Sequence, residues 1–447
     1  MFQIAIFISC WAVSNLGLMI EDDHQNWPQF RGPSGNGVAL NANPPTQWTA
    51  DSAKWVVKIP GKGSASPVIW KDKVILLTAV ETDRKEPGAQ EPPPVDPEQE
   101  GRSRFGRRRP KPTNIHEFHV MCIDRNTGEV LWRTKVNEAV PHESGHSTNT
   151  QSSGSPVTDG QHIWASFNSF GIFCLDMDGH IKWERQLGTM STRNGFGEGA
   201  TPALYEDTLI VNWDHEGQSF IEAMDAKTGK TKWKKDRDER TTWSTPLIVK
   251  HDDQVQIITN GTQRVRSYDL ANGDLIWECG GQVGNPIPTP LVIDDMVICM
   301  TGFRGNAAMG IPLDSRGDIT DTEKIAWVRN DIGPYVPTGV LYKGQIYSTK
   351  GSTAIMTAID AKTGETIIDE VRLEGIRSLY ASMVAANDRI YITGRKGNTV
   401  VLKHGDQLEI IANNELGEPV DATPAIVGNQ IFLRGDKHLY CFERSDK

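Results

Sequence analysis

Histidine and acidic side chains, the groups best suited to bind a metal or transfer a proton, gather in two stretches of this chain. "PHESGHSTNTQSSG" contains His142 and His146, and "NWDHEGQ" contains Asp214, His215 and Glu216. Imidazole and carboxylate groups bind many divalent ions, so these five residues could form a metal site. Three consecutive side chains cannot all point the same way, however, and a salt-bridged network that supports the loops is the simpler interpretation. We therefore expect no metal here.

Arginines occupy equivalent positions in several later loops. Their guanidinium groups recognise carboxylates, and they would form a positive ring although the net charge is −10. The acidic average argues against a nucleic-acid-binding surface spread over the molecule. A ligand of this ring would be acidic, either an anionic polymer or an acidic protein segment. The candidate ligand-binding residues are His142, His146, Arg193, Asp214, His215, Glu216, Arg264, Arg304, Arg395 and Arg434.

Catalytic motifs are missing from the sequence. It contains no Ser-His-Asp arrangement, no G-x-S-x-G turn and no phosphate-binding Gly loop. The six cysteines include no C-x-x-C motif and no adjacent pair, so neither zinc nor a disulfide between neighbours is indicated. Cys122, Cys174 and Cys441 lie in "VMCID", "IFCLD" and "LYCFE", which are typical of small buried residues in strands. The residues favour binding over catalysis.

An internal repeat positions these loops. Its first marker is a small residue before Pro and apolar residues, and it occurs eight times, spaced by 41 to 47 residues after a first interval of 89. The copies begin at Ser66, Ser155, Thr201, Thr245, Thr289, Val336, Ser382 and Thr423. The second marker is Asp, then Gly four residues later and Trp or Ile eight residues later, as in "DAKTGKTKW" at Asp225–Trp233. Asp and Thr bond turn backbone, and Gly supplies positive φ.

Four short antiparallel strands in each of eight units predict an all-β fold, an eight-bladed β-propeller. The N-terminal strand in "AKWVVKI" should complete the last blade and close the ring, leaving no exposed sheet edge. We expect a monomer.

Large flat side chains near the blade ends should pack each blade on the next, each contributing roughly 2–3 kcal/mol on burial. These structural residues are Trp55, Trp132, Trp183, Trp233, Trp277 and Trp327, with Ile368 replacing Trp once.

The two faces of such a propeller differ in their loops. The turns between first and second and between third and fourth strands are short and alike, and we call this the regular face. The second-to-third loops and blade-to-blade links, such as 140–154, are long and irregular, and they form the irregular face. Binding residues tend to lie on such loops. The insertion 81–117 also falls there, and its Pro-rich acidic and then basic composition predicts a disordered loop; a docking arm through Arg102, Arg104 and Arg107–Arg109 is the alternative.

The first twenty residues are apolar and predict a signal peptide and export to the periplasm or cell envelope, although no Lys or Arg precedes the apolar run. A lipid anchor at Cys10 is the alternative. We expect an N-terminal extension at 21–47 and the propeller at 48–447. After the N-terminus, no apolar run of eighteen or more residues could span a membrane.

The Ser-Pro … Leu-Asp-x-x-Thr-Gly-x-x-x-Trp units resemble the pyrroloquinoline-quinone (PQQ) repeat of quinoprotein dehydrogenases and of BamB-like propellers. "NWPQFRGPSGNG" at Asn26–Gly37 and "NWDHEGQSFI" at Asn212–Ile221 resemble exported PQQ-like propellers. In the dehydrogenases, the resemblance implies PQQ above a disulfide of adjacent cysteines and a calcium site with an aspartate base, and neither set is found here. We therefore expect no cofactor and a non-catalytic scaffold that binds a protein or peptide partner. The alternative is a PQQ-dependent oxidoreductase or a metal-dependent hydrolase at the same face.

Overall fold

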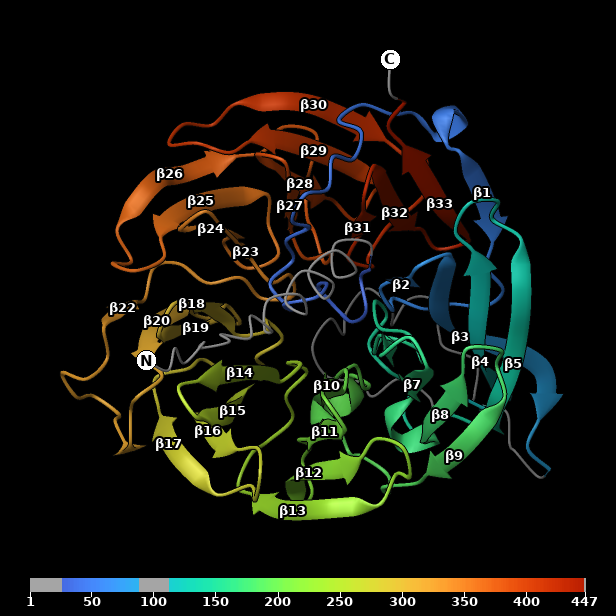
Figure 1. The fold of residues 1–447 in the computed structure, drawn as a ribbon, viewed down its shortest axis with the longest axis horizontal. Coiled ribbons are helices and arrows are strands. Elements are labelled where there is room, and N and C mark those ends of the chain that lie inside the picture. The colour runs from blue at the N-terminus through green and yellow to red at the C-terminus, as the bar shows by residue number, and fades with distance from the viewer. Residues whose placement is uncertain (1–25, 88–111, 446–447) are drawn as a thin grey trace, which may run out of the picture.

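The computed structural model describes residues 26–87 and 112–445, and they form a ring of eight four-stranded antiparallel blades around a central axis (Figure 1). The predicted eight-bladed β-propeller is therefore confirmed. In each blade the strands follow one another in sequence from the axis outward, except in the last blade, which the N-terminal strand completes. The predicted signal peptide, with Cys10, lies outside the described residues, as does most of the basic half of the insertion.

The first four blades contain these strands: β2 (Val68–Trp70), β3 (Lys73–Lys85), β4 (Asn114–Asp124), β5 (Val130–Ala139); β6 (Val157–Thr158), β7 (His162–Ser166), β8 (Ile172–Asp176), β9 (Ile181–Arg185); β10 (Ala203–Tyr205), β11 (Thr208–Trp213), β12 (Ser219–Asp225), β13 (Thr231–Arg237); β14 (Leu247–His251), β15 (Gln254–Asn260), β16 (Val265–Asp269), β17 (Leu275–Cys279). A fifth strand, β21 (Gly317–Asp318), pairs in parallel with β17. Within the described ranges, the short 3-10 helices are η2 (Ala50–Ser52), η3 (Asn168–Phe170) and η4 (Arg193–Gly195).

The last four blades contain these strands: β18 (Leu291–Ile293), β19 (Met296–Thr301), β20 (Ala307–Pro312), β22 (Trp327–Arg329); β23 (Val340–Tyr342), β24 (Gln345–Thr349), β25 (Ile355–Asp360), β26 (Thr366–Arg372); β27 (Val384–Ala386), β28 (Arg389–Thr393), β29 (Asn398–Lys403), β30 (Ile410–Glu415); β31 (Ala425–Val427), β32 (Gln430–Arg434), β33 (His438–Glu443) and β1 (Trp55–Lys58). β1 pairs antiparallel with β33, with Trp55 opposite Cys441, so the ring closes as predicted.

The Asp–Gly–Trp spacing in the sequence reflects one contact repeated between blades. The indole N–H of Trp183 donates to the carbonyl oxygen of Ala226, the residue after the turn Asp225 of the next blade, at 3.0 Å. Gly229 of the same turn has φ +68°, and a Cβ built on it would lie only 2.8 Å from Trp183. The turn Gly is therefore needed twice, for its backbone conformation and for the indole that packs on it. The same indole-to-carbonyl bond joins Trp55 to Arg125, Trp132 to Met177, Trp233 to Leu270 and Trp327 to Ala361.

Trp277 is the exception among the predicted structural tryptophans. It is fully buried, but its indole donates to Gln256 Oε1 in its own blade at 3.2 Å. Gln256 in turn donates from Nε2 to the carbonyl oxygen of Leu313 in the next blade at 2.8 Å. That blade carries "LDSRG" rather than the repeated turn, so a glutamine side chain replaces the direct bond between blades.

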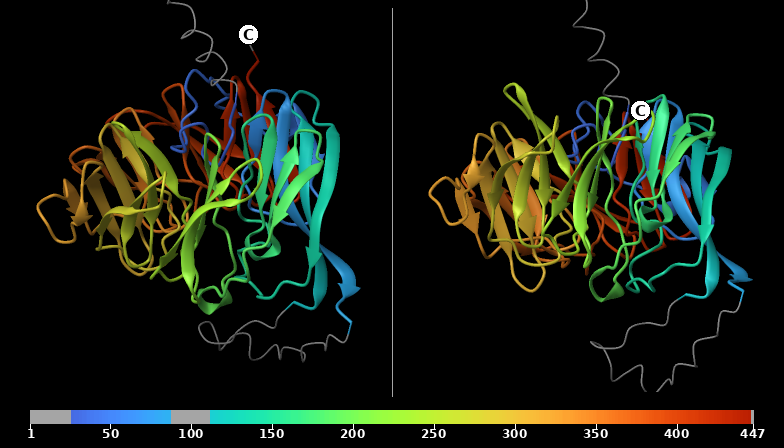
Figure 2. Two further views of the ribbon diagram at one scale, coloured as in Figure 1. Left: turned by 60° about the horizontal axis from the view of Figure 1, so that its bottom comes forward. Right: turned by 90° about the horizontal axis from the view of Figure 1, so that it is seen from below.

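The N-terminal extension closes the axis from the regular face. Trp27 exchanges backbone hydrogen bonds with Ile69 of β2, and Val38 bridges Ala385 of β27. Arg31 between them is fully buried and donates to carbonyl oxygens of the extension and of residues just before the inner strands β23 and β27, including Gly339 at 2.7 Å. Burial lowers the pKa of Arg31 to about 9. In Figure 2 this segment (blue) lies at the face opposite the tip of the β3–β4 hairpin.

The ends of the predicted disordered insertion are strands. β3 continues to Lys85 and β4 begins at Asn114, and Lys85 pairs with Asn114. The prediction of disorder was therefore wrong for residues 81–85 and 114–117, where the hairpin extends beyond the blade (Figure 2). Ion pairs from Arg84 to Glu117 and Glu138, both at 2.9 Å, stabilise this extension. Residues 88–111 lie outside the described part.

The five cysteines of the described ranges are buried thiols, and burial raises the pKa of Cys122 to about 12. No helix in residues 26–87 or 112–445 is long and apolar enough to cross a membrane.

Candidate functional site

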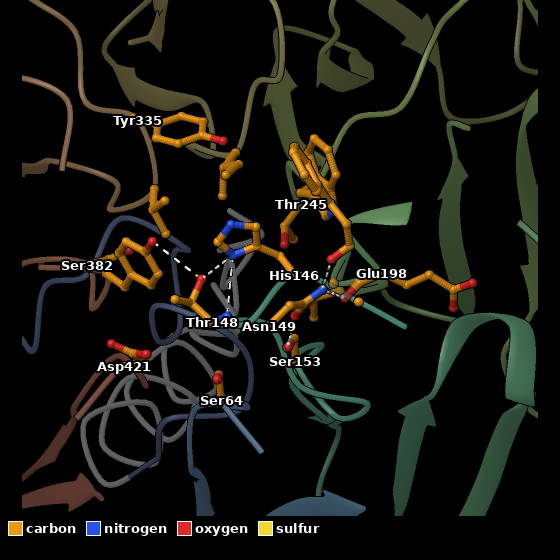
Figure 3. A pocket seen from close by; sticks show the side chains of 18 of the residues that line it. Ser64, His146, Thr148, Asn149, Ser153, Glu198, Thr245, Tyr335, Ser382 and Asp421 are labelled. Carbon is orange, nitrogen blue, oxygen red and sulfur yellow. Dashed lines mark hydrogen bonds between the residues drawn. The ribbon is translucent and has the colours of Figure 1, made fainter. Parts of the chain in front are cut away.

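A cavity of about 1320 Å³ lies on the propeller axis. Blade-to-blade links form most of its wall, including 144–149, 193–199 and Trp243, and the loop with Phe303 and Arg304 adds to it. All of these segments belong to the irregular face. Phe30 of the N-terminal extension also lines the cavity. Figure 3 shows Tyr335 and Ser382 on one side of it and Asn149, Ser153 and Glu198 on the other.

A ring of Ser and Thr hydroxyls surrounds the axis where each first strand begins. At five places around this ring, the hydroxyl accepts a hydrogen bond from the backbone N–H of the equivalent residue in the preceding blade. These bonds run from Ser66 to Ser155 to Thr201, and from Thr289 to Thr338 to Ser382 to Thr423, at 2.9–3.0 Å. The small residue of the sequence marker is thus a bond between neighbouring blades.

The sixth copy of that marker requires a correction. The sequence suggested Val336 before Pro337, but Thr338 takes the equivalent position, two residues before β23 begins. Thr338 both accepts from Thr289 and donates to Ser382. In this blade the Pro precedes the residue of the Ser/Thr ring instead of following it. The position predicted from the Pro is therefore two residues too early.

Aromatic side chains form much of the cavity wall. Phe196 and Trp243 are adjacent, with ring centroids 6.5 Å apart, and the Trp243 indole donates to the Gly197 carbonyl oxygen at 2.7 Å. Phe303 packs on Tyr335 with centroids 5.0 Å apart. Sequence analysis did not include these four residues among the candidates. The Gly-rich loops in which they lie were the only indication of a binding role. The residues next to them in the sequence do not indicate that the aromatic rings face the axis.

Two of the predicted arginines line the cavity without an acidic partner. No carboxylate of the described residues lies within 4.0 Å of the Arg193 or Arg304 guanidinium, although Arg193 donates to Asn285 Oδ1 at 3.1 Å. Both lie near the Tyr335 hydroxyl: burial raises the pKa of Tyr335, and the charges of Arg193 and Arg304 oppose this. The two cations therefore act on the same part of the cavity.

The two carboxylates that line the cavity, Asp421 and Glu198, have partners of their own, and the pKa of Glu198 is raised. Asp421 forms a bidentate ion pair with Arg395 at 2.7 and 2.9 Å, and the Arg395 guanidinium lies 3.9 Å from the Tyr380 ring centroid. Glu198 accepts a hydrogen bond from the Ser169 backbone N–H at 2.9 Å and one from the Ser169 hydroxyl. Burial raises the pKa of Glu198 to about 7, with a further contribution from Glu143. Arg193 and Arg304 thus give the cavity a net positive charge.

His142 and His146, two of the three predicted histidines, have different surroundings. His146 lines the cavity, where its Nδ1 lies 2.8 Å from the Thr148 hydroxyl and its ring packs edge-on against Phe196. His142 lies behind the wall, with Nε2 2.9 Å from the Met190 carbonyl oxygen and 3.4 Å from Glu198. The two imidazoles therefore do not form one site.

Asp214, His215 and Glu216 hold loops together, which agrees with the simpler interpretation from sequence. Asp214 is buried in a bidentate pair with Arg237, at 2.7 and 3.0 Å. His215 Nδ1 accepts from the Ser191 N–H at 3.1 Å, and Glu216 accepts from the Thr241 hydroxyl at 2.8 Å. The described residues contain no group of three His, Cys, Asp or Glu side chains that could hold a metal.

Arg264 and Arg434, expected at the ligand face, do not line the cavity. Arg264 pairs with Asp318 of the fifth strand at 2.8 Å. Arg434 is buried, with its guanidinium donating to the carbonyl oxygens of Ala65 and Leu77 at 3.0 and 2.7 Å. Equivalent loops therefore do not place their arginines equivalently.

A calcium-bound PQQ does not fit the residues present. The two carboxylates that line the cavity, Glu198 and Asp421, are occupied by Ser169 and Arg395. The cysteines are separate buried thiols within blades. We therefore derive no step through a quinone.

Comparison with known proteins gives relatives of two kinds. BamB of Yersinia pestis, an outer membrane protein assembly factor, is 24% identical over 267 residues, which cover 56% of this chain and 60% of that relative. BamB of Moraxella catarrhalis has a TM-score of 0.56 at 14% identity, covering 87% of this chain and 98% of that one. A quinohemoprotein alcohol dehydrogenase of Comamonas testosteroni has a TM-score of 0.60 at 10% identity, covering 96% and 82%. At these identities the structural likeness concerns the fold alone.

The match to a family is more specific than these fold likenesses. The family model described as outer membrane protein assembly factor BamB matches residues 116–370, more than half of the 447 residues. The PQQ-like propeller predicted from the repeats is thereby confirmed. This chain belongs to the BamB family of β-propeller proteins.

Proposed function

We propose that this protein is a scaffold of the cell envelope that binds a segment of a protein partner in the axial cavity of its irregular face. Membership of the BamB family supports a role in the envelope and a protein partner. The observation that carries the proposal is the cavity itself. Its volume of about 1320 Å³ exceeds the roughly 300–1,000 Å³ typical of small-molecule pockets, so a loop or chain end of another protein fits it better than a metabolite does.

The scaffold around the cavity suits this role. Two layers of repeated contacts, the Ser/Thr ring and the indole bonds between blades, hold the links that form the wall. Arg31 of the N-terminal extension ties the inner strands together near the axis. A rigid frame lowers the entropy that binding must overcome. The cavity residues sit on loops over that frame, as binding residues commonly do.

Photo-crosslinking in the native cell tests the proposal. A benzophenone amino acid would replace Ser147, an exposed residue that lines the cavity, or Lys227, an exposed residue in a turn of the regular face. We expect one protein to be crosslinked from Ser147 and not from Lys227, with mass spectrometry giving the contacted segment. Crosslinks only from Lys227, or equal ones from both positions, would reject the axial cavity as the binding site.

A further inference from the structure

We propose that the segment bound in the axial cavity is acidic and that Arg193 and Arg304 bind its carboxylates. This inference rests on the proposed function and names the chemistry of the partner segment. It begins with a contrast of charge, because an acidic protein with a net charge of −10 holds two arginines in its central cavity without acidic partners among the described residues. A second acidic molecule would be repelled by most of this protein and attracted here.

The other charges of the cavity strengthen the argument. Asp421 is neutralised by Arg395, and Glu198 is held by Ser169 with a pKa raised by burial to about 7. Neither carboxylate is placed to pair with Arg193 or Arg304. The two guanidinium groups therefore keep their donors for a ligand, apart from the bond of Arg193 to Asn285 at 3.1 Å. Bonds between guanidinium and carboxylate are about twice as strong as neutral hydrogen bonds.

The two arginines are also directed to one place. Both line the same cavity as Tyr335, whose pKa is raised by burial while the charges of Arg193 and Arg304 oppose this. Arg304 has φ +54°, a left-handed conformation that is disfavoured for residues other than Gly and Asn. The loop "GFRGN" thus keeps an arginine where glycine would be easier to accommodate.

Aromatic rings beside the arginines indicate what else the segment carries. Trp243 and Phe196 line the wall near Arg193, and Phe303 packs on Tyr335 near Arg304. Such rings bury apolar or aromatic side chains. An acidic segment with at least one apolar or aromatic residue between its carboxylates therefore matches both kinds of wall.

Selection from a random peptide library displayed on phage tests the chemistry without knowledge of the partner. The purified full-length protein is the bait, and an Arg193→Gln/Arg304→Gln double variant is the comparison. Arg133→Gln, which changes an exposed arginine on the outer strand β5, is the matched control. We expect selected peptides rich in Asp and Glu beside aromatic residues, obtained with the wild type and Arg133→Gln and lost with the double variant.

The best peptide and its Asn/Gln counterpart would then be compared by calorimetry. Each Arg→Gln change should weaken binding of the acidic peptide by about tenfold or more, and Arg→Lys should retain part of it. Binding should also weaken as salt rises. Unchanged melting temperatures of the variants would confirm that they are folded. Selection of neutral or basic peptides, no enrichment at all, or equal affinity in the double variant would overturn the inference.

The crosslinking experiment separates this inference from the proposed function. A partner crosslinked from Ser147 through a neutral segment, and equally in the double variant, would leave the proposed function standing and refute the acidic segment. Acidic peptides that require Arg193 and Arg304, together with no crosslinked protein in the cell, would support the chemistry of the cavity and refute the scaffold role.

Discussion

The blade junctions and the axial cavity are built from the same repeats but behave differently. At the junctions one contact recurs, in which the indole of one blade bonds to the turn of the next, as Trp183 does to Ala226 and Trp233 to Leu270. At the cavity only the Ser/Thr ring recurs. The wall above it differs from blade to blade, with Arg193 in one link and Trp243 in the next. Repetition marks the residues that hold the ring together, and departures from it mark the residues that can bind.

Removal of Arg237 should give the largest effect on stability. Arg237 is 4% exposed and pairs with Asp214, which is 1% exposed. Arg237→Met would leave a buried carboxylate without its partner, and we expect the free energy of unfolding to fall by about 3–5 kcal/mol. Urea denaturation measures this. The double variant with Asp214→Ala should lose less than the sum of the single changes, because the two residues interact. Additive losses would show that Asp214 is not held by Arg237.

The second prediction is that Glu198, a residue of the cavity wall, makes the stability of the protein depend on pH. The pKa of Glu198 is raised from 4.5 to about 7, so the folded protein binds its proton more tightly than the unfolded chain does. Stability should therefore fall as pH rises from about 4.5 to about 7 and stay lower above that, by an amount on the order of 3 kcal/mol. Glu198→Gln should remove this fall.

The difference between wild type and Glu198→Gln isolates this group, because His142 and Glu143 nearby are present in both proteins. Unfolding free energies should be similar near pH 4.5 and higher for the variant near pH 8. Parallel profiles at all pH values would mean that Glu198 stays charged in the folded protein. The cavity would then be less positive than its geometry indicates.

The third prediction tests the junctions with a matched pair of glycines. Gly229 and Gly344 both lie in turns of the regular face with positive φ, +68° and +83°. A Cβ at Gly229 would meet Trp183 at 2.8 Å, whereas a Cβ at Gly344 would meet nothing within 4 Å. Both Ala variants suffer the backbone strain, so Gly229→Ala should lose roughly 1–3 kcal/mol more than Gly344→Ala. Equal losses would show that the indole adapts and that the turn Gly serves its backbone alone.

Features that depend on residues close together in the sequence could be predicted, whereas features that depend on contacts between distant loops could not. The Asp225–Trp233 repeat lies within nine residues of one unit, so the junctions and the ring of blades could be predicted from a pattern. Arg264, Arg304, Arg395 and Arg434 lie at or just after the end of the second strand in four blades. Arg264 nevertheless pairs with Asp318, Arg304 lines the cavity, Arg395 pairs with Asp421 and Arg434 is buried. Their partners lie in other loops, and no local pattern encodes such a choice.

The contacts of the N-terminal extension could not be predicted from the sequence either. "NWPQFRG" has no period and no neighbour of its own kind in the sequence. Its role depends on inner strands more than three hundred residues later, where Arg31 donates to Gly339 and Met383. A plug of this kind becomes visible only when the ring is closed, because the closed ring creates the axis that it fills.

The smallest effect is predicted for Arg304→Gly, which should increase stability and weaken binding. Arg304 adopts φ +54°, a conformation that costs a residue with a Cβ roughly 1–2 kcal/mol. Arg304→Gly would remove this strain, while the greater freedom of Gly in the unfolded chain offsets about 0.5–1 kcal/mol of the gain. Arg304 forms no ion pair among the described residues, and its guanidinium lies 5.2 Å from the Phe303 ring centroid. We therefore expect the variant to be more stable by about 0.5–1 kcal/mol, measured by urea denaturation, and to bind acidic peptides less well. A loss of stability instead would show that Arg304 supports the structure of the propeller. The distinction between structural residues at the blade junctions and binding residues in the cavity would then not hold for Arg304.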